Sequence, residues 1–227
     1  MAGNETFMLV EIIYDPSCPW CYIGKRQLDA ALAARPGVRV RRRWWPFLIN
    51  PDLPSAGLDR ADFLTRKFGS EARVSRLYRA IAHVGRSVRI DFDFERIDRV
   101  PNSLHAHRLV CMAARAGRAD AAVEALFESH FVRGLDIGNR LVLAHIGASI
   151  GLQPSAVTTY LMSDADTDLV LEENTRAQQL GINGVPAFVF AGMFVVCGAQ
   201  DPKALTRMLD AARTAGAARI RPRELVR

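Results

Sequence analysis

The sequence predicts an α/β fold in which a mixed β-sheet is covered by helices and carries a large all-helical insertion. Three observations predict it. A strand–helix–strand pattern opens the chain, a helix–strand–strand–helix pattern closes it, and residues 61–163 between them have almost only helical patterns. A strand–helix–strand unit places its strands parallel, whereas two strands joined by a tight turn pair antiparallel. We therefore expect both ends of the chain to share one mixed sheet.

The opening unit begins with an apolar segment at residues 7–13 (FMLVEII), which is typical of a buried strand. The segment at residues 20–37 then predicts a helix that has Pro19 in its first turn and ends just before Gly37. Lys25 and Arg26 of this helix are expected to point into water. Residues 38–45 (VRVRRRWW) alternate in part, which predicts a strand near a sheet edge with a solvated arginine face.

The middle of the chain predicts a block of helices joined by short loops. Most of the helical segments are followed by a glycine at the position where a helix commonly ends. Residues 92–102 (FDFERIDRVPN) are expected to be a linker inside this block. The predicted helices cover residues 60–69, 71–85, 103–117, 119–134, 139–151 and 154–162.

The closing unit begins with a helix that is expected to start near Ser163, as its cap, and to stop at Gly181. Residues 186–191 (PAFVFA) and 193–198 (MFVVCG) predict two short strands in a hairpin. A last helix over residues 201–216 has Asp201 as its cap and proline at its first position. The tail, residues 217–227, is basic and is expected to be loosely ordered.

Composition indicates a folded soluble protein: 49% of the residues are hydrophobic and 24% are charged. No apolar run approaches the about 20 residues that span a bilayer, and the N-terminus lacks the pattern of a secretory signal. We therefore expect a cytoplasmic protein without membrane contact. The net charge of +6 comes from arginines spread along the whole chain, which indicates a compositional bias rather than a nucleic-acid surface.

Cys18 and Cys21 form a C-x-x-C pair where the first strand meets the first helix. The positive end of a helix favours the thiolate, the reactive form of cysteine, and Cys21 follows about one turn later. A zinc site would need two more ligands, and Cys111 and Cys197 have no partner near them in sequence. A structural disulfide is unusual in the cytoplasm. Redox exchange without a bound metal is the favoured interpretation.

A second motif, GVPAF at residues 184–188, places a proline at the start of an apolar strand. Such a proline is unusual unless its peptide bond is cis or the strand end is special. If the Val185–Pro186 bond is cis, its backbone could lie beside Cys18 and pair with an extended substrate.

With both motifs in view, the chain resembles the DsbA-like thioredoxin-fold oxidoreductases, and within them the FrnE-like branch, from about Phe7 to Gly216. The resemblance rests on DPSCPWCYIGK, PFLINP, NSLHAHRL, GINGVPAFVF and GAQ. It implies a thioredoxin fold with a helical insertion. It also implies Cys18 as the attacking thiol, Cys21 as the resolving thiol, and Pro186 as a cis-proline beside them.

The same motifs suggest residues that line a substrate cleft. Asn50, Asn102, His105 and Arg108 lie in these motifs, although Asn102 also fits a helix cap. Family members often have serine at the position of Cys197, which is read here either as a third thiol near the site or as a small buried residue. The predicted substrate-binding set is Pro19, Trp20, Val185, Pro186, Asn50 and Asn102.

Three functions compete. The first is a thiol–disulfide oxidoreductase without a bound cofactor, acting on protein or small-molecule thiols and disulfides, with glutathione as the candidate redox co-substrate. The second is a glutathione-dependent isomerase or transferase of the kappa-class type, acting on a small aromatic or polyketide-like molecule. These relatives typically have serine at the position of Cys18. The third is a non-catalytic binding module that uses the cleft at Pro186.

The expected division of the chain follows from the same patterns. Residues 7–60 and 164–216 are expected to form a discontinuous thioredoxin-like domain, and residues 61–163 the helical insertion domain. The basic tail covers residues 217–227. A monomer and a homodimer are both compatible with the sequence.

Overall fold

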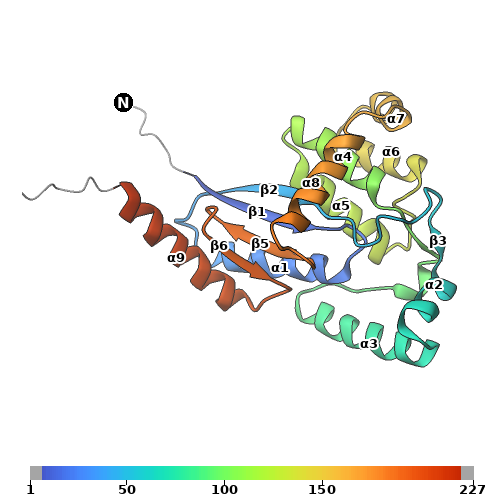
Figure 1. The fold of residues 1–227 in the computed structure, drawn as a ribbon, viewed down its shortest axis with the longest axis horizontal. Coiled ribbons are helices and arrows are strands. Elements are labelled where there is room, and N and C mark those ends of the chain that lie inside the picture. The colour runs from blue at the N-terminus through green and yellow to red at the C-terminus, as the bar shows by residue number, and fades with distance from the viewer. Residues whose placement is uncertain (1–6, 221–227) are drawn as a thin grey trace, which may run out of the picture.

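The structure, a computed structural model, describes residues 7–220 of the chain, with side chains up to residue 216. At its centre lies a four-stranded mixed sheet, in which the order of the strands is β2-β1-β5-β6 (Figure 1). The strands are β1 (Met8–Tyr14), β2 (Val40–Pro46), β5 (Ala187–Phe190) and β6 (Phe194–Cys197).

Strand pairing confirms that both ends of the chain share one sheet. Strand β1 pairs in parallel with β2, with Ile12 opposite Trp44. On its other side β1 pairs antiparallel with β5, with Ile12 opposite Phe188, and β5 and β6 form the expected antiparallel hairpin. The N-terminal strand is therefore an inner strand, held between the opening and closing units of the chain.

Helices cover both faces of this sheet. The helices α1 (Pro19–Ala33) and α9 (Pro202–Ile220) pack against each other and share a large core with Val10, Ile12 and Tyr14 of β1. The opposite face carries a smaller core, in which Ile13 and Trp45 meet residues of α8 (Thr167–Gln179) and of the loop before β5. The alternation along β1 therefore serves two separate cores.

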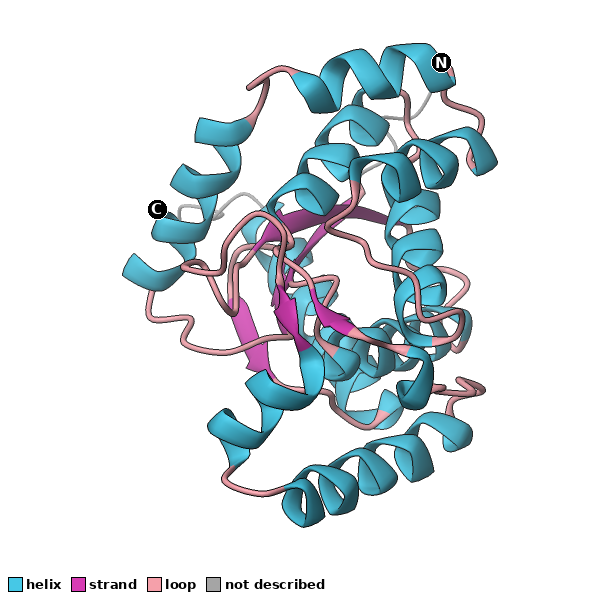
Figure 2. Ribbon diagram, turned by 90° about the vertical axis from the view of Figure 1, so that its right-hand side faces the viewer, coloured by secondary structure: helices cyan, strands magenta, loops and turns pink. Residues whose placement is uncertain are grey.

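All six helices predicted between the two units are present. Figure 2 shows that helices surround the strands. No helix among the described residues is long and apolar enough to span a bilayer. The division into a thioredoxin-like domain and an insertion domain stays a prediction. The six helices are α2 (Arg60–Phe68), α3 (Glu71–Ser87), α4 (Leu104–Arg115), α5 (Ala119–Phe131), α6 (Arg140–Ser149) and α7 (Pro154–Met162).

The linker at residues 92–102 has more structure than predicted. It contains a short 3₁₀ turn, Phe94–Arg96, and the strand β4 (Arg99–Val100), which pairs with β3 (Leu58–Asp59) in a second, two-stranded sheet. Strands of two residues are too short to show a period in the sequence. Their pairing ties the start of α2 to the segment before α4.

Three helix ends differ from the prediction. Helix α8 begins at Thr167, and Ser163 instead ends α7, because Asp166 adopts a left-handed conformation (φ 60°) just before α8. Helix α1 already ends at Ala33. Helix α9 continues to Ile220, into the segment expected to be loose, and residues 221–227 lie outside the described part of the chain.

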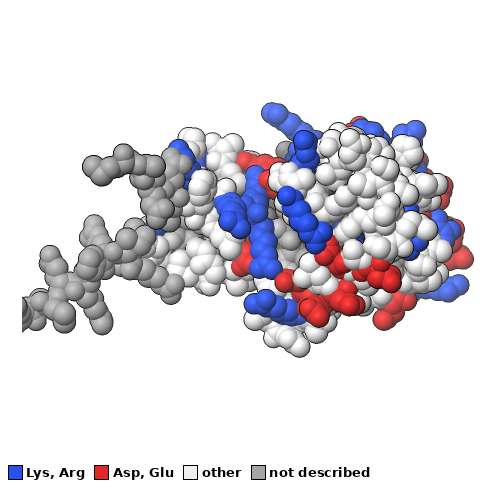
Figure 3. All heavy atoms as spheres, turned by 90° about the horizontal axis from the view of Figure 1, so that it is seen from above, with Lys and Arg blue, Asp and Glu red and all other residues white. Residues whose placement is uncertain are grey.

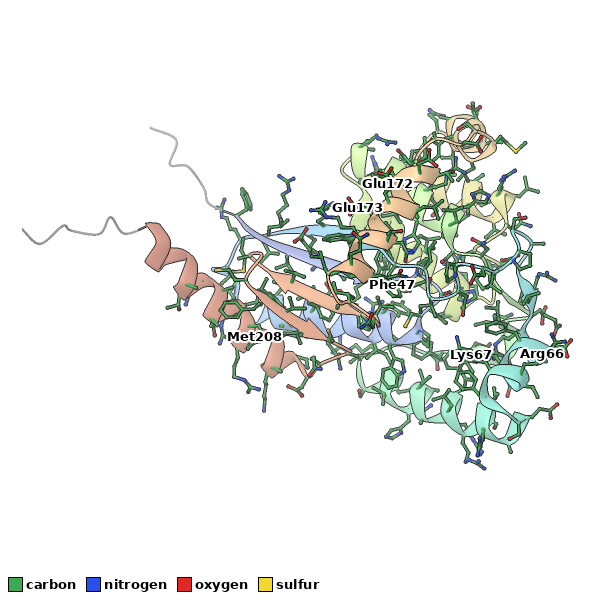
Figure 4. The ribbon with its side chains drawn as sticks, viewed as in Figure 1. Phe47, Arg66, Lys67, Glu172, Glu173 and Met208 are labelled. Carbon is green, nitrogen blue, oxygen red and sulfur yellow. The ribbon has the colours of Figure 1, made fainter. Side chains whose placement is uncertain are left out.

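The predicted arginine face of β2 is solvent-exposed at Arg41 and Arg43, and β2 is an edge strand as expected. Arg42 pairs with Asp29 at 2.6 Å, and Arg43 pairs with Glu11 and Glu173, both at 3.0 Å. Figure 4 shows Glu173 on α8 close to this strand. Because α5 and α8 both contact β2, its arginines meet carboxylates of neighbouring elements.

Lys25 also differs from the expectation that it points into water. Lys25 is only 6% exposed, and its Nζ lies 2.6 Å from Glu124 of α5 and 3.0 Å from Asp29. Arg26 shares Glu124 at 2.5 Å. The packing of α1 against α5 encloses these charges, so that they join the two helices.

Candidate active site

Cys18 is the N-cap residue of α1, and its position is fixed by the backbone. Its N–H donates to the carbonyl oxygen of Asp15 at 3.0 Å, and its own carbonyl accepts from the N–H of Cys21 at 3.0 Å. The Cys18 side chain does not cap the helix, and Pro19 occupies the first helical position. The thiol therefore lies at the positive end of α1, where a negative charge is favoured.

Cys21 lies one turn further and is 2% exposed. Burial raises its pKa well above the usual value, and a hydrogen bond with the Cys18 side chain raises it further. The two sulfurs are therefore close neighbours in unlike surroundings. Cys21 is held as a thiol, while Cys18 borders a cavity. Cys18 is itself buried, with 6% exposure, so the two thiols differ in their access to the cavity.

The loop before β5 completes the site from the other end of the chain. The Val185–Pro186 peptide bond is cis, and the Cys18 thiol lies 3.8 Å from the carbonyl oxygen of Val185, to which it can donate. The carbonyl of Pro186 accepts from the N–H of Gly198 at 2.7 Å. The hairpin β5–β6 thereby holds this loop against the cysteine.

Gly24 of α1 allows the loop to come this close. A Cβ at this position would lie 2.8 Å from Cγ of Pro186 and 3.1 Å from Cζ of Phe188. Real side chains do not tolerate the first of these distances. The sequence analysis missed Gly24, although its place in the CPWCYIG motif, one turn after Cys21, was a signal.

Asp15 is the second residue that the sequence analysis missed. Its carboxylate is buried, with 1% exposure, and accepts four hydrogen bonds. The N–H and hydroxyl of Ser17 both donate to Oδ1 at 2.8 Å, and Oδ2 accepts from the N–H of Ile49 at 2.9 Å and the hydroxyl of Ser103 at 3.1 Å. Asp15 thus joins the cysteine loop, the loop after β2 and the start of α4.

The cavity beside Cys18 has a volume of about 350 Å³, within the range of small-molecule sites. Helices α2 and α3 and the linker supply an apolar wall that includes Phe63, Leu77 and Phe94. Arg60, Lys67 and Arg99 also line it; its other described lining residues include no Asp or Glu. The cavity is therefore apolar and positively charged.

The predicted substrate-binding residues are only partly brought together. Pro19, Trp20 and Asn50 line the cavity, and Asn50 accepts from Nζ of Lys67 at 3.1 Å. Val185 faces the cysteine through its carbonyl oxygen, and neither Val185 nor Pro186 is among the lining residues of this cavity.

Asn102 is not among the lining residues, because both ends of its side chain are used elsewhere. Its Nδ2 donates to the carbonyl of Leu53 at 2.7 Å, and its Oδ1 accepts from the N–H of Leu104 at the start of α4. It caps the helix, as the other interpretation held. Ser103 makes no such cap, since its hydroxyl bonds Asp15.

The remaining candidates lie away from the site. Arg108 is buried and donates to the backbone carbonyls of Tyr160, Ser163 and Ala165, so that it holds the end of α7. His105 bonds to Arg108.

Neither of the two further cysteines lines the cavity at Cys18. Burial raises the pKa of Cys111 to about 11, which makes its thiol inert at neutral pH. Cys197 ends β6 and is exposed, not a small buried residue. Among the described residues, no group of three His, Cys, Asp or Glu side chains is arranged to hold a metal ion.

A mixed sheet with a cysteine pair at the start of its first helix and a cis-proline facing it defines a thioredoxin-like protein. The DSBA-like thioredoxin domain model matches residues 9–210, and the chain belongs to this DsbA-like family. Among proteins with curated descriptions, none matches the chain.

Solved structures show the same fold over nearly the whole chain. A probable DsbA oxidoreductase from Streptomyces coelicolor is 28% identical, with a TM-score of 0.84, over 96% of this chain and 94% of that one. A 2-hydroxychromene-2-carboxylate isomerase is 17% identical (TM-score 0.66; 93% and 97% covered). The cytosolic disulfide reductase DsbM from Pseudomonas aeruginosa is 19% identical (TM-score 0.59; 93% and 98% covered), and it has also been solved with glutathione.

Proposed function

We propose that the protein is a thiol–disulfide oxidoreductase of the FrnE-like branch that uses Cys18 and Cys21 as its redox couple. One observation carries the proposal: the hydrogen-bonded pair is asymmetric. Cys21 is buried with a raised pKa, and Cys18 lies at a helix N-terminus beside a cavity and the carbonyl of Val185. Family membership supports oxidoreductase chemistry in general.

The reaction follows from this geometry in two exchanges. The Cys18 thiolate attacks one sulfur of a substrate disulfide, forms a mixed disulfide and releases the other sulfur as a thiolate, which takes a proton from solvent. Cys21 then loses its proton and attacks Sγ of Cys18. This step releases the second substrate thiol and leaves a Cys18–Cys21 disulfide. Two electrons pass from the protein to the substrate, and the reverse sequence oxidises a dithiol.

Trapping tests the proposal. In a Cys197→Ser background, which removes the exposed thiol, the Cys21→Ser variant should accumulate a mixed disulfide when mixed with a disulfide substrate, since the second exchange is blocked, and Cys18→Ser should accumulate none. Cys111→Ser is the matched control and should behave like the unchanged protein. Mass spectrometry of the intact protein measures the adducts. An adduct that forms equally on Cys18→Ser would contradict the assignment of Cys18 as the attacking thiol.

The cavity supports an acidic thiol or disulfide as the substrate, of which glutathione is the candidate. Arg60, Lys67 and Arg99 line it without a carboxylate among the other lining residues, whereas glutathione carries two carboxylates. The relative DsbM, solved with glutathione, supports the same choice. A cation at the cavity would bind a carboxylate through a charge-assisted hydrogen bond.

Neighbouring residues of α2 provide a matched test of this choice. Lys67 bonds to Asn50 at the cavity, whereas Arg66 does not line it; Figure 4 labels both side chains. Lys67→Gln should raise KM for oxidised glutathione about tenfold, the equivalent of one charged hydrogen bond, with little change in kcat. Arg66→Gln should leave both values unchanged. Equal effects of the two variants would point to long-range charge rather than a binding site.

The second candidate is a glutathione-dependent isomerase acting on a small aromatic molecule. The aromatic wall of the cavity and the likeness of the fold to 2-hydroxychromene-2-carboxylate isomerase favour it. The two functions separate on Cys18→Ser. This variant should lose all disulfide exchange under our proposal, whereas an isomerase that needs no protein disulfide would keep its activity.

We also propose that the protein works in the cytoplasm and mainly as a reductase. The relative DsbM is described as a cytosolic disulfide reductase, and the glutathione pool of the cytosol keeps accessible dithiols reduced. Rapid acid quenching of cells followed by thiol alkylation should find Cys18 and Cys21 mostly as free thiols. A mainly oxidised pair would indicate an oxidase instead.

A further inference from the structure

A second cavity, of about 570 Å³, lies between β2 and the helices α4, α5 and α8 and shares no lining residue with the cavity at Cys18. We propose that it binds a small organic anion that carries an aromatic ring. The proposal rests on the charge of the cavity, a buried hydroxyl without a partner and an aromatic wall, and it does not depend on the redox chemistry of Cys18.

Positive charge dominates the lining of this cavity. It contains Arg41, Arg42, Arg43 and Arg115 against two acidic residues, Asp120 and Glu173. Figure 3 shows basic side chains gathered in a band on this face of the molecule, bordered by acidic ones.

Arg41 is the arginine of this cavity that has no carboxylate partner among the described residues. Three of the four arginines already have carboxylate partners: Arg42 pairs with Asp29, Arg43 with Glu173, and Arg115 with Asp166. Arg41 is exposed and makes no ion pair within the part of the chain that the structure describes. An anion in the cavity would therefore meet a guanidinium whose donors are free.

Tyr14 provides the second, independent observation. Tyr14 is 1% exposed and lines the cavity, yet its hydroxyl has no hydrogen-bond partner among the described residues. A buried hydroxyl without a partner is costly, and native structures rarely keep one. The neighbours of the ring are Trp44 and His107, at centroid distances of 4.9 and 5.0 Å. Neither supplies a bond to the hydroxyl, so a ligand oxygen in the cavity could accept from it.

The wall of the cavity indicates what surrounds the anionic group. Trp44, Val110, Ala114 and Leu169 line it together with the arginines. The indole N–H of Trp44 is already bonded to Asp120, which fixes the ring as a flat apolar surface. A bare phosphate would leave this surface uncovered, and a nucleic acid would need cations that are not already paired. An aromatic acid satisfies the cation, the hydroxyl and the ring surface together.

The three tryptophans act as reporters of where a ligand binds. Trp20 lines the cavity at Cys18, Trp44 lines this one, and Trp45 belongs to the small core against α8. We would titrate the ¹⁵N-labelled full chain with 2-naphthoate and follow the three indole N–H signals. The Trp44 signal should shift in a saturable way. The neutral 2-naphthylmethanol and inorganic phosphate should each bind at least about tenfold more weakly, since each lacks one half of the recognised chemistry.

Two variants assign the contacts. Arg41→Gln should weaken 2-naphthoate binding about tenfold and Tyr14→Phe about fivefold, as expected for a charged and a neutral hydrogen bond. Tyr14→Phe removes only the unpartnered hydroxyl, so its unfolding midpoint should not fall. Lys67→Gln, which changes the other cavity, should leave the Trp44 titration unchanged. The proposal is overturned if Trp44 does not respond, if the neutral analogue binds as tightly, or if Arg41→Gln has no effect.

Discussion

At the scale of single residues, Asp15 shows how a carboxylate can position a reactive thiol without touching a substrate. Its two oxygens receive donors from the cysteine loop, from the loop after β2 and from the residue that precedes α4. Three segments distant in sequence are therefore fixed next to Cys18. The residue acts through the backbone of its neighbours, and we regard it as a positioning residue.

Asp15→Ala should destabilise the protein by about 2 to 4 kcal/mol, because it leaves the N–H groups of Ser17 and Ile49 and two hydroxyls without their acceptor. Urea unfolding measures this change. Asp52→Ala, at an exposed position, is the control and should change stability by less than about 0.5 kcal/mol. A loss as small as that of the control would mean that water replaces the carboxylate at little cost.

Residue-scale features were the hardest to predict from the sequence. The C-x-x-C pair and Pro186 stand in short motifs, so they were found. Asp15 and Gly24 were missed, because their importance lies in contacts with Ser103 and Pro186, which are far away in sequence. Asn102 fitted two roles, and only its two hydrogen bonds decided between them.

At the scale of elements, the approach of α1 to the loop before β5 sets the geometry of the site. Gly24→Ala places a methyl group 2.8 Å from Cγ of Pro186. We expect a net destabilisation of about 1 to 2 kcal/mol, typical of overpacking, together with slower disulfide exchange as the loop moves away from Cys18.

Gly37→Ala is the matched control for this prediction, since a Cβ at that position meets no atom within 4 Å. It should not destabilise the protein. Thermal unfolding and the rate of Cys18 alkylation measure the two effects. Helix propensity alone would favour alanine at position 24 by about 1 kcal/mol, so a stabilised Gly24→Ala protein would show that the contact is easily relieved.

Helices and strands were predicted best where they are long enough for their period to show in the sequence. Every helix of at least nine residues was found in the sequence, whereas β3 and β4, with two residues each, were not. The ion pairs of the arginines in β2 were not predicted, for a different reason. Alternation shows which residues share a face, but not that carboxylates from α8 would lie on it.

At the scale of the whole molecule, buried histidines should make stability depend on pH. Burial lowers the pKa of His130 to about 4, against about 6.5 in an unfolded chain. Between these values the unfolded state binds a proton that the folded state does not. Stability should therefore be complete above pH 6.5 and fall, by on the order of 3 kcal/mol, as the pH drops towards 4.

Urea unfolding at pH 7 and pH 5 measures this loss. His130→Asn should lower stability at pH 7 and reduce the dependence on pH without abolishing it, because burial also lowers the pKa of His105 and His107. His83→Asn, at an exposed position, should keep the full dependence. The prediction fails if His130→Asn and the unchanged protein lose the same free energy between the two pH values.

The fold as a whole was predictable because the sheet-forming patterns stand at the two ends of the chain and the helical patterns between them. The family resemblance then identified the thioredoxin fold. The sequence motifs identified Cys18 and Pro186 as site residues, but they did not predict which segments distant in the chain meet at the site. The cavity at Cys18 draws on α2, α3 and the linker, and no local pattern shows that these segments meet.

The placement of β1 between strands from opposite ends of the chain also bears on how the protein is made. Val185, whose carbonyl faces Cys18, follows it by 167 residues. A ribosome adds about 5 to 20 residues per second, so the cysteine pair emerges on the order of 10 s before the segment that completes its surroundings. During that interval β2 can already pair with β1, but the loop at Val185 and strand β5 are missing, so the proposed redox site is complete only after those segments have been made.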